Sequence, residues 1–123
     1  MATWTSDELA QIDAADELQV ASLRHDGTLS NPVTIWVVRR GDDLYVRSIR
    51  GPDSGWFSGT QRSHEGHIQA GGVDKDVTFV ETADLDDEID DAYRTKYGRY
   101  PENVLNTTLT PQARSTTLKL VPR

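Results

Sequence analysis

Hydrophobic and polar residues alternate along several short segments of the chain, the pattern expected of strands with one buried face. The alternation predicts strands over residues 18–24, 33–38, 44–49, 67–70, 73–81 and 115–121. Segment 33–38 differs from the others because both of its faces carry apolar side chains, among them Ile35 and Trp36. A strand of that kind is central in a sheet or lies at a subunit contact.

Two other segments have the periodicity of amphipathic helices. The first begins at a predicted capping box, in which Thr5 caps the helix and Glu8 reaches back to it. Trp4 precedes the cap and is spaced to pack against Leu9. The second helix spans residues 84–98, and we interpret its acidic first half as a solvated helix start that complements the helix dipole.

These elements predict a single domain over residues 1–123, because neither an internal repeat nor a linker divides the chain. Strands do not alternate regularly with helices, which favours an antiparallel sheet over a parallel α/β sheet. We therefore expect a mainly β protein, a small antiparallel β-barrel of about six strands with peripheral helices.

The composition limits which cellular compartment and which binding partners we expect. The formal net charge is −7, which argues against nucleic acid or an anionic membrane as the main partner. Cysteine is absent, so disulfides, thiolate nucleophiles and cysteine-ligated metals are excluded. No run approaches the ~20 apolar residues of a membrane span, and the acidic N-terminal segment lacks the apolar core of an export signal. We expect a cytoplasmic protein.

The segment after the third strand combines arginines with an aromatic residue. Arg47 and Arg50 lie at the strand end, a Gly51-Pro52 turn follows, and Trp56 comes soon after the turn. Guanidinium groups and open backbone amides beside an aromatic ring suit a phosphorylated planar ligand. The alternative is that the arginines are solvated charges and that Trp56 belongs to the core.

Three tyrosines gather at the end of the second helix, at positions 93, 97 and 100. Tyr97 and Tyr100 can line a pocket, where a phenol donates a hydrogen bond or a proton. The alternative is that these tyrosines are amphipathic packing residues.

Other catalytic and metal-binding motifs are weak or absent. His64 and His67 flank Glu65 and Gly66, but their spacing is not the four-residue step of a zincin helix, and the glycine interrupts a helix. We expect turn residues there and no metal site. Neither a glycine-rich phosphate loop nor a Gly-x-Ser-x-Gly elbow is present, so familiar hydrolase chemistry has no support.

Two parts of the sequence resemble the split-barrel deazaflavin-dependent nitroreductases. The first combines NPVTIWVVRRGDDLYVRSIRG with GWFSGTQRSHEGHIQAGG: a strand with proline, a Gly-Asp turn, a strand ending in a small-residue loop, and an aromatic pair before a short helix. The second is the Tyr97-Gly98-Arg99-Tyr100 loop with the closing strand. The likeness covers roughly residues 23–123, and it is closer still to a small uncharacterised bacterial family allied to this superfamily.

The resemblance implies an FMN-binding, pyridoxamine-phosphate-oxidase-like split β-barrel, commonly a homodimer that holds FMN or a deazaflavin near the subunit contact. It also implies a small-molecule substrate. Two sets of residues match the family by position: for the cofactor, Arg47, Ser48, Arg50 and Trp56, and for the substrate, Tyr97 and Tyr100. Arg24 is a further cofactor candidate, because it keeps part of the charge of the family's phosphate loop.

Two departures from the family concern the cofactor. The Thr-Gly-Arg-Lys/Arg phosphate loop is replaced by residues 23–27, which keep only part of its charge, and Gly-Gly-x-Pro is reduced to Arg50-Gly51-Pro52. Despite these departures, the resemblance implies a flavin- or deazaflavin-binding oxidoreductase that reduces a small organic acceptor. The sequence leaves open a cofactor-free split barrel that binds a small molecule or works as an accessory protein. The two apolar faces around Trp36 predict a homodimer with an interface of ~1,600 Å².

Overall fold

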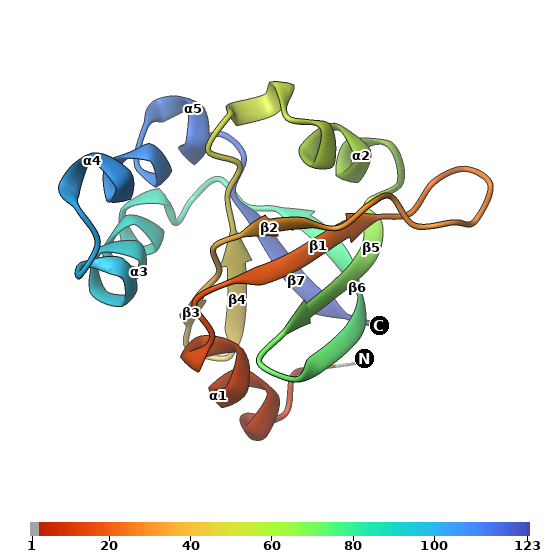
Figure 1. The fold of residues 1–123 in the computed structure, drawn as a ribbon, viewed down its shortest axis with the longest axis horizontal. Coiled ribbons are helices and arrows are strands. Elements are labelled where there is room, and N and C mark those ends of the chain that lie inside the picture. The colour runs from red at the N-terminus through yellow and green to blue at the C-terminus, as the bar shows by residue number, and fades with distance from the viewer. Residues whose placement is uncertain (1–2) are drawn as a thin grey trace.

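The computed structural model describes residues 3–123, in which one curled antiparallel sheet is surrounded by short helices (Figure 1). Within these residues seven strands pair in the order β2-β1-β5-β6-β7-β4-β3. The strands are β1 (Leu18–Ser22), β2 (Val33–Ile35), β3 (Val38–Arg40), β4 (Asp43–Val46), β5 (Glu65–Ala70), β6 (Val73–Glu81) and β7 (Leu118–Pro122). The predicted antiparallel, mainly β architecture with peripheral helices is confirmed, with seven strands in place of about six.

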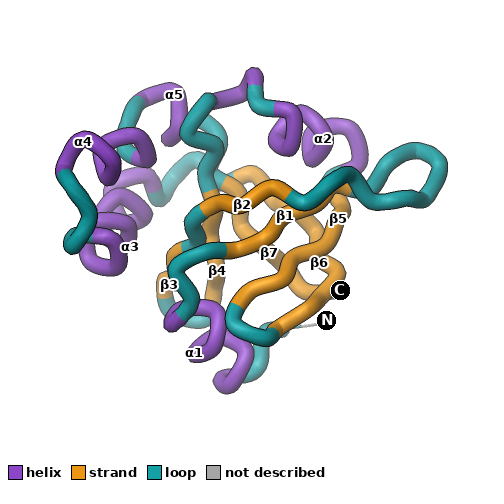
Figure 2. The backbone as a smooth tube through the Cα atoms, in the orientation of Figure 1, coloured by secondary structure: helices purple, strands orange, loops and turns teal. Residues whose placement is uncertain are grey.

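The helices gather in three places around the sheet. Figure 2 shows α3, α4 and α5 together on one side, α2 over one end, and α1 at the opposite end. Their bounds are α1 (Ser6–Ala14), α2 (Gly55–Ser63), α3 (Asp86–Tyr97), α4 (Glu102–Leu105) and α5 (Pro111–Arg114), with 3₁₀ turns η1 (Gly51–Asp53) and η2 (Asn106–Thr108). None of the helices within residues 3–123 has the length and apolar character needed to cross a membrane.

The prediction of one strand over residues 33–38 was wrong, because the structure divides it into β2 and β3 at the two edges of the sheet. β2 pairs with β1 and β3 pairs with β4, while Trp36 and Val37 carry the chain from one edge to the other. The physical reason is a break in alternation: Val37 and Val38 are consecutive, yet both are buried, each in a different core. Apolar residues on both faces therefore reflect two edge strands and not one central strand.

The first helix begins as predicted. The Glu8 backbone N–H donates to Thr5 Oγ1 at 3.1 Å, and the Thr5 N–H donates to Glu8 Oε1 at 2.9 Å, which completes the capping box. Trp4 is buried in the same core as Leu9, and its indole N–H donates to the Leu120 carbonyl at 2.9 Å. This hydrogen bond ties the start of the chain to the last strand.

Two separate cores hold the fold together. The larger fills the interior of the curled sheet and includes residues from α1 and α2. The smaller lies between α3 and the strands β3 and β4, and is formed by Val38, Tyr45, Ile89, Tyr93 and Tyr97. The predicted helix over 84–98 is confirmed as α3, and its buried face forms one side of this second core.

Candidate functional site

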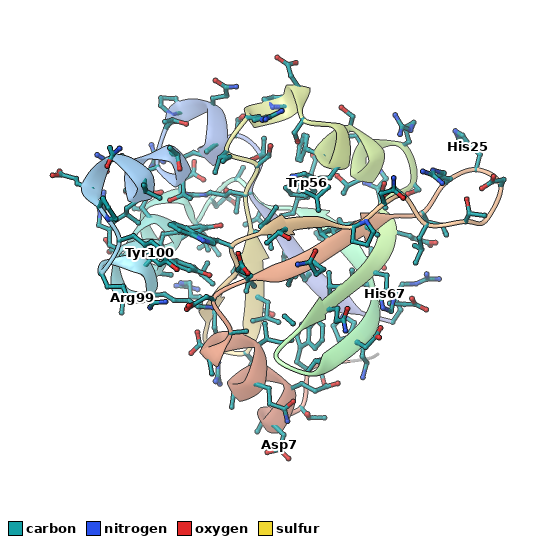
Figure 3. The ribbon with its side chains drawn as sticks, viewed as in Figure 1. Asp7, His25, Trp56, His67, Arg99 and Tyr100 are labelled. Atoms are coloured by element: carbon teal, nitrogen blue, oxygen red, sulfur yellow. The ribbon has the colours of Figure 1, made fainter. Side chains whose placement is uncertain are left out.

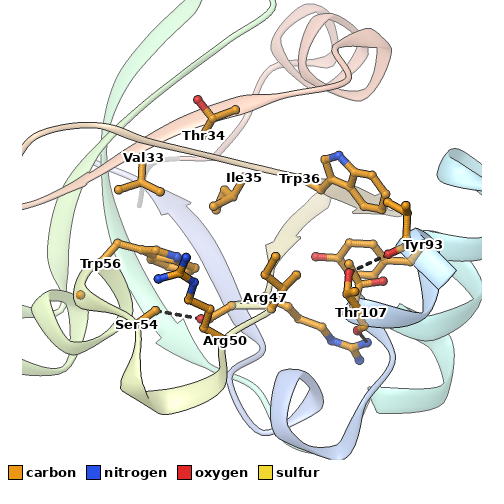
Figure 4. Close-up of a pocket in the computed structure, with 15 residues that line it drawn as sticks. Val33, Thr34, Ile35, Trp36, Arg47, Arg50, Ser54, Trp56, Tyr93 and Thr107 are labelled. Atoms are coloured by element: carbon orange, nitrogen blue, oxygen red, sulfur yellow. Dashed lines mark hydrogen bonds between the residues drawn. The ribbon is translucent and has the colours of Figure 1, made fainter. Parts of the chain in front are cut away.

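A cavity of about 610 Å³ lies where β2, the end of β4, the start of α2 and α3 come together (Figure 4). That volume is within the usual range for small-molecule and cofactor sites. Its walls are largely apolar, with Val33, Ile35, Trp36, Ile49, Trp56 and Val104. Its main polar contributions come from Arg47, Ser48, Arg50, Ser54, Tyr93, Thr107 and Thr108.

The turn from β4 into α2 is held by its own hydroxyl groups. Ser48 Oγ contacts the Gly51 carbonyl and Ser54 Oγ, each at 2.8 Å, and Ser54 Oγ accepts from the Phe57 N–H to cap α2. Gly51 has φ +71°, and a Cβ at that position would lie 2.1 Å from the Gln112 side chain. The predicted cofactor residue Ser48 thus lines the pocket, but its hydroxyl is engaged within the turn.

Arg47 is buried, with 2% of its surface exposed, and its guanidinium is engaged by the protein itself. Nε donates to Thr117 Oγ1 at 2.9 Å, and Nη1 donates to Asp90 Oδ1 at 2.5 Å and to the Thr108 carbonyl at 2.9 Å. Nη2 donates to the Asp86 carbonyl at 3.2 Å. Four hydrogen bonds therefore connect the end of β4 to α3, η2 and the segment before β7.

The charge of Arg47 is balanced by carboxylates from α3. Asp90 forms a buried ion pair with it, and Asp86 Oδ1 lies 3.6 Å from Nη2. Arg47 is therefore not the solvated strand-end charge considered from the sequence, because α3 covers it. Asp90 is also buried, which corrects the interpretation of the acidic half of α3 as wholly solvated.

Arg50 lies only three residues further along the chain but in a different environment. It is exposed and lines the pocket, and within residues 3–123 its guanidinium forms no hydrogen bond or ion pair. The first turn of α2, with Gly55 and Trp56, lines the same cavity. Trp56 is 7% exposed and belongs to the larger core as well, so it is both a core residue and part of the pocket wall.

Arg24 is not brought to this cavity. It lies in the long connection between β1 and β2, where it is exposed and outside the lining of the pocket. Figure 3 shows the neighbouring His25 at the outer end of that connection, on the far side from Tyr100. The arginines predicted to bind a cofactor phosphate therefore do not all lie together within one chain.

Tyr97 and Tyr100 lie beside the pocket wall and do not line the cavity. The Tyr97 ring stacks on Trp36 with 3.9 Å between centroids, and its hydroxyl contacts the Asp16 carbonyl and the Val37 N–H. Burial raises the pKa of Tyr97 above its usual range. Tyr100 is half-buried and packs on Trp36 at 5.0 Å between centroids. Together they support the indole that forms part of the wall.

Tyr93 is a pocket residue to which sequence reasoning assigned no binding role. It has no exposed surface, it lines the cavity, and its hydroxyl has no hydrogen-bond partner within residues 3–123. Burial, which penalises the phenolate, is the largest influence on the pKa of Tyr93 and raises it above its usual range. The Arg47 guanidinium and backbone N–H lower it by less, and that N–H does not have the geometry of a hydrogen bond to the hydroxyl. Helical spacing from Tyr97 was the available signal, and it indicated only a packed face.

The two histidines of the His-Glu-Gly-His segment lie on different elements. His64 ends α2 with φ 57°, and His67 lies in β5, where its ring contacts Asp74 and Asp76 on β6. Among residues 3–123 no group of three histidine or carboxylate side chains is arranged to hold a metal ion. Desolvation lowers the pKa of His67, but the hydrogen bonds to Asp76 and Asp74 outweigh it, so the pKa is raised overall.

The sequence matches the profile of one protein family over residues 8–120. The chain belongs to the DUF2255 family. The description of DUF2255 is "uncharacterized protein conserved in bacteria". A search of curated proteins finds no match to the chain.

Solved structures share the DUF2255 fold over nearly its whole length. They include the conserved hypothetical protein Rv2991 from Mycobacterium tuberculosis, with a TM-score of 0.62 and 11% identity, covering 100% of this chain and 82% of the other. An F420 reductase has a TM-score of 0.57 and 12% identity, covering 93% and 90%. A FAD-binding protein from Mesorhizobium loti has a TM-score of 0.58 and 15% identity, covering 99% and 92%. The fold is therefore a split β-barrel, as the resemblance predicted.

Proposed function

We propose that this protein is an oxidoreductase that binds a flavin or deazaflavin in the cavity and reduces a small organic acceptor. The observation that carries the proposal is a cavity of about 610 Å³ with an exposed arginine at its wall, Arg50, whose guanidinium is unpaired among residues 3–123. A planar ring with an anionic tail needs both features. The split-barrel fold, shared with a reductase and a FAD-binding protein, supports the same class of ligand.

The residues present fit the ring portion of such a cofactor. Trp36 and Trp56 come from opposite sides of the cavity, one between β2 and β3 and the other on α2, and Val33 and Ile35 add aliphatic surface (Figure 4). Aromatic and aliphatic walls favour a flat apolar ring through surface burial and stacking. Tyr97 holds the Trp36 indole in place by stacking.

The anionic tail has one clear partner in this chain. Arg50 can donate charge-assisted hydrogen bonds to a phosphate, and the first turn of α2 adds the partial positive charge of a helix N-terminus. Arg47 supplies no net charge there, since Asp90 and Asp86 balance it. Arg24 lies outside the cavity, so any role in binding would depend on another copy of the chain.

When bound, the cofactor would supply hydride transfer, and the protein would supply orientation and a dry site. Tyr100, half-buried on Trp36 and outside the cavity lining, would contact an acceptor beside the wall, as the family resemblance implied. The homodimer expected from the sequence is also part of this proposal. Val33, Ile49 and Val104 are exposed aliphatic residues of the pocket lining, and a second copy over them would remove that apolar surface from water.

The second candidate function is a cofactor-free split barrel that binds a small neutral molecule. Its support is the internal neutralisation of Arg47, which leaves the cavity with fewer free cations than a phosphorylated cofactor commonly meets. A neutral ligand would use the aromatic walls and have no need of Arg50. The two functions thus differ in what removal of Arg50 should do.

Equilibrium fluorescence titration with FMN and with its 5-deaza analogue tests the proposed function. Wild type should bind at least one of them, and Arg50→Ala should weaken binding roughly ten- to a hundredfold, because a hydrogen bond to a charged group contributes ~1.5–3 kcal/mol. Arg40→Ala is the matched control, since Arg40 is an exposed arginine outside the cavity. A wild-type protein that binds neither nucleotide contradicts the proposal and favours the second candidate.

A further inference from the structure

Tyr93 combines three properties that no other pocket-lining residue in the described chain combines. It is completely buried, it lines the cavity, and its polar atom has no partner. Figure 4 shows the side chain extending from α3 towards the interior of the pocket. Arg47 is also buried in the same wall, but its guanidinium is engaged by four hydrogen bonds.

The Tyr93 ring is held from two sides. The Arg47 guanidinium carbon lies 5.4 Å from the ring centroid, and the Tyr97 ring packs with 6.1 Å between centroids. These contacts are made by the aromatic ring and would be the same for a phenylalanine. They fix the direction of the hydroxyl without satisfying it.

A buried hydroxyl without a partner costs folding free energy, because the hydrogen bonds it makes to water when unfolded are lost. Phenylalanine would fill the same space without that cost. The hydroxyl therefore does not stabilise the folded chain by itself. A molecule in the cavity can provide the missing hydrogen-bond partner.

We propose that Tyr93 donates a hydrogen bond to an acceptor atom of the bound ligand and so selects planar heteroaromatic ligands with a carbonyl oxygen or ring nitrogen at the inner edge. With Arg50 on the anionic tail, the site then recognises a ligand with an acceptor at one end and a negative charge at the other. The inference rests on the proposed function, since it describes the same cavity. The raised pKa of Tyr93 keeps the phenol protonated at ordinary pH, as a donor must be.

The hydroxyl is sealed from water in this conformation, so the inner edge of a ligand reaches it by displacing a neighbouring side chain. The seal also means that water does not compete for the hydrogen bond before the ligand arrives.

Tyr93→Phe tests the inference, with binding of FMN and of 5-deaza-FMN and a thermal melt measured in parallel. Loss of one neutral hydrogen bond should weaken binding roughly three- to tenfold, while the melting temperature stays the same or rises. Tyr45→Phe is the control: Tyr45 is a buried tyrosine of the same core outside the cavity, and its removal should leave binding unchanged.

Three results would overturn the inference. Equal binding by wild type and Tyr93→Phe means that the hydroxyl does not contact the ligand, and the proposed function survives. Weaker binding with a lower melting temperature means that the hydroxyl supports the fold. If wild type binds neither nucleotide, the proposed function and this inference fall together.

Discussion

Arg47 and Arg50 are three residues apart in the sequence, yet they lie in opposite environments. Arg47 is buried under α3 and donates four hydrogen bonds, two of which go to groups on α3 itself. Arg50 is exposed at the cavity and has no partner for its guanidinium among the described residues. The difference shows that a guanidinium near a pocket is available to a ligand only where the protein has not already satisfied it.

The cause of the difference is the position of α3. Asp86 and Asp90 are four residues apart and therefore lie on the same helical face, which meets the end of β4. Three residues further on, just before η1, the Arg50 carbonyl accepts a hydrogen bond from the Gln112 side chain, and the Arg50 guanidinium has no partner among the described residues. The same helix thus makes one arginine structural and leaves the other for binding.

Replacing the buried arginine should have the largest effect. Arg47→Met keeps much of the side-chain volume but removes the closer of two cationic partners of the buried Asp90, and leaves it with Arg114, whose Nε lies 3.3 Å from Asp90 Oδ2. We expect the free energy of unfolding to fall by up to ~3–5 kcal/mol, the cost of breaking a buried ion pair. Urea denaturation of wild type and variant measures it. A loss below about 1 kcal/mol would show that the network under α3 contributes little.

A double-mutant cycle sharpens this result. Asp90→Asn alone should destabilise the protein, whereas Asp90→Asn combined with Arg47→Met should cost less than the sum of the two single changes, with a coupling of at least ~1 kcal/mol. The free energies of unfolding of the four proteins give the coupling. Additive effects would mean that the two side chains do not stabilise each other.

His67 offers a third environment, because its contacts with Asp74 and Asp76 are partly exposed. Its pKa is raised in the folded protein, so these contacts stabilise the fold fully below pH ~6.5 and lose that effect as the pH rises through the folded pKa. We expect His67→Gln to cost less than ~1 kcal/mol at pH 5.5 and nothing at pH 8.5. Thermal melts at both pH values check this. An equal loss of stability at the two pH values would show that the positive charge of His67 does not stabilise the fold.

Arg50→Ala should have the smallest effect on stability. An exposed guanidinium without a partner leaves no buried group unpaired when it is removed, so the free energy of unfolding should stay within ~0.5 kcal/mol of wild type. The same urea titration used for Arg47→Met measures it. A loss comparable to that of Arg47→Met would remove the distinction between the two arginines.

The sequence predicted those parts of the fold that depend on local pattern. The capping box at Thr5, the strand over 73–81 and the helix over 84–98, observed as Asp86–Tyr97, follow from neighbouring residues and are confirmed. The same patterns failed at Val37 and Val38, because the alternation changes phase where the chain passes between two cores. Local periodicity predicts strands well but does not indicate to which edge of a sheet each one belongs.

The site was less predictable because its electrostatics are formed by distant residues. Arg47 meets Asp90, 43 positions later, and Thr117, 70 positions later. Neither partner could be assigned to it from spacing. The unpaired hydroxyl of Tyr93 is likewise defined by what surrounds it in space, whereas its position on a helical face indicated only packing.

The most direct test of the central claim compares the affinities of FMN and riboflavin, which differ by one phosphate, for wild type and for Arg50→Ala. The account predicts that wild type prefers FMN to riboflavin roughly ten- to a hundredfold. Arg50→Ala should lose most of this preference, because the phosphate adds affinity through its contact with the Arg50 guanidinium. If Arg50→Ala keeps the full preference for FMN, or wild type binds both ligands equally, Arg50 does not bind the anionic tail and the account of the pocket is wrong.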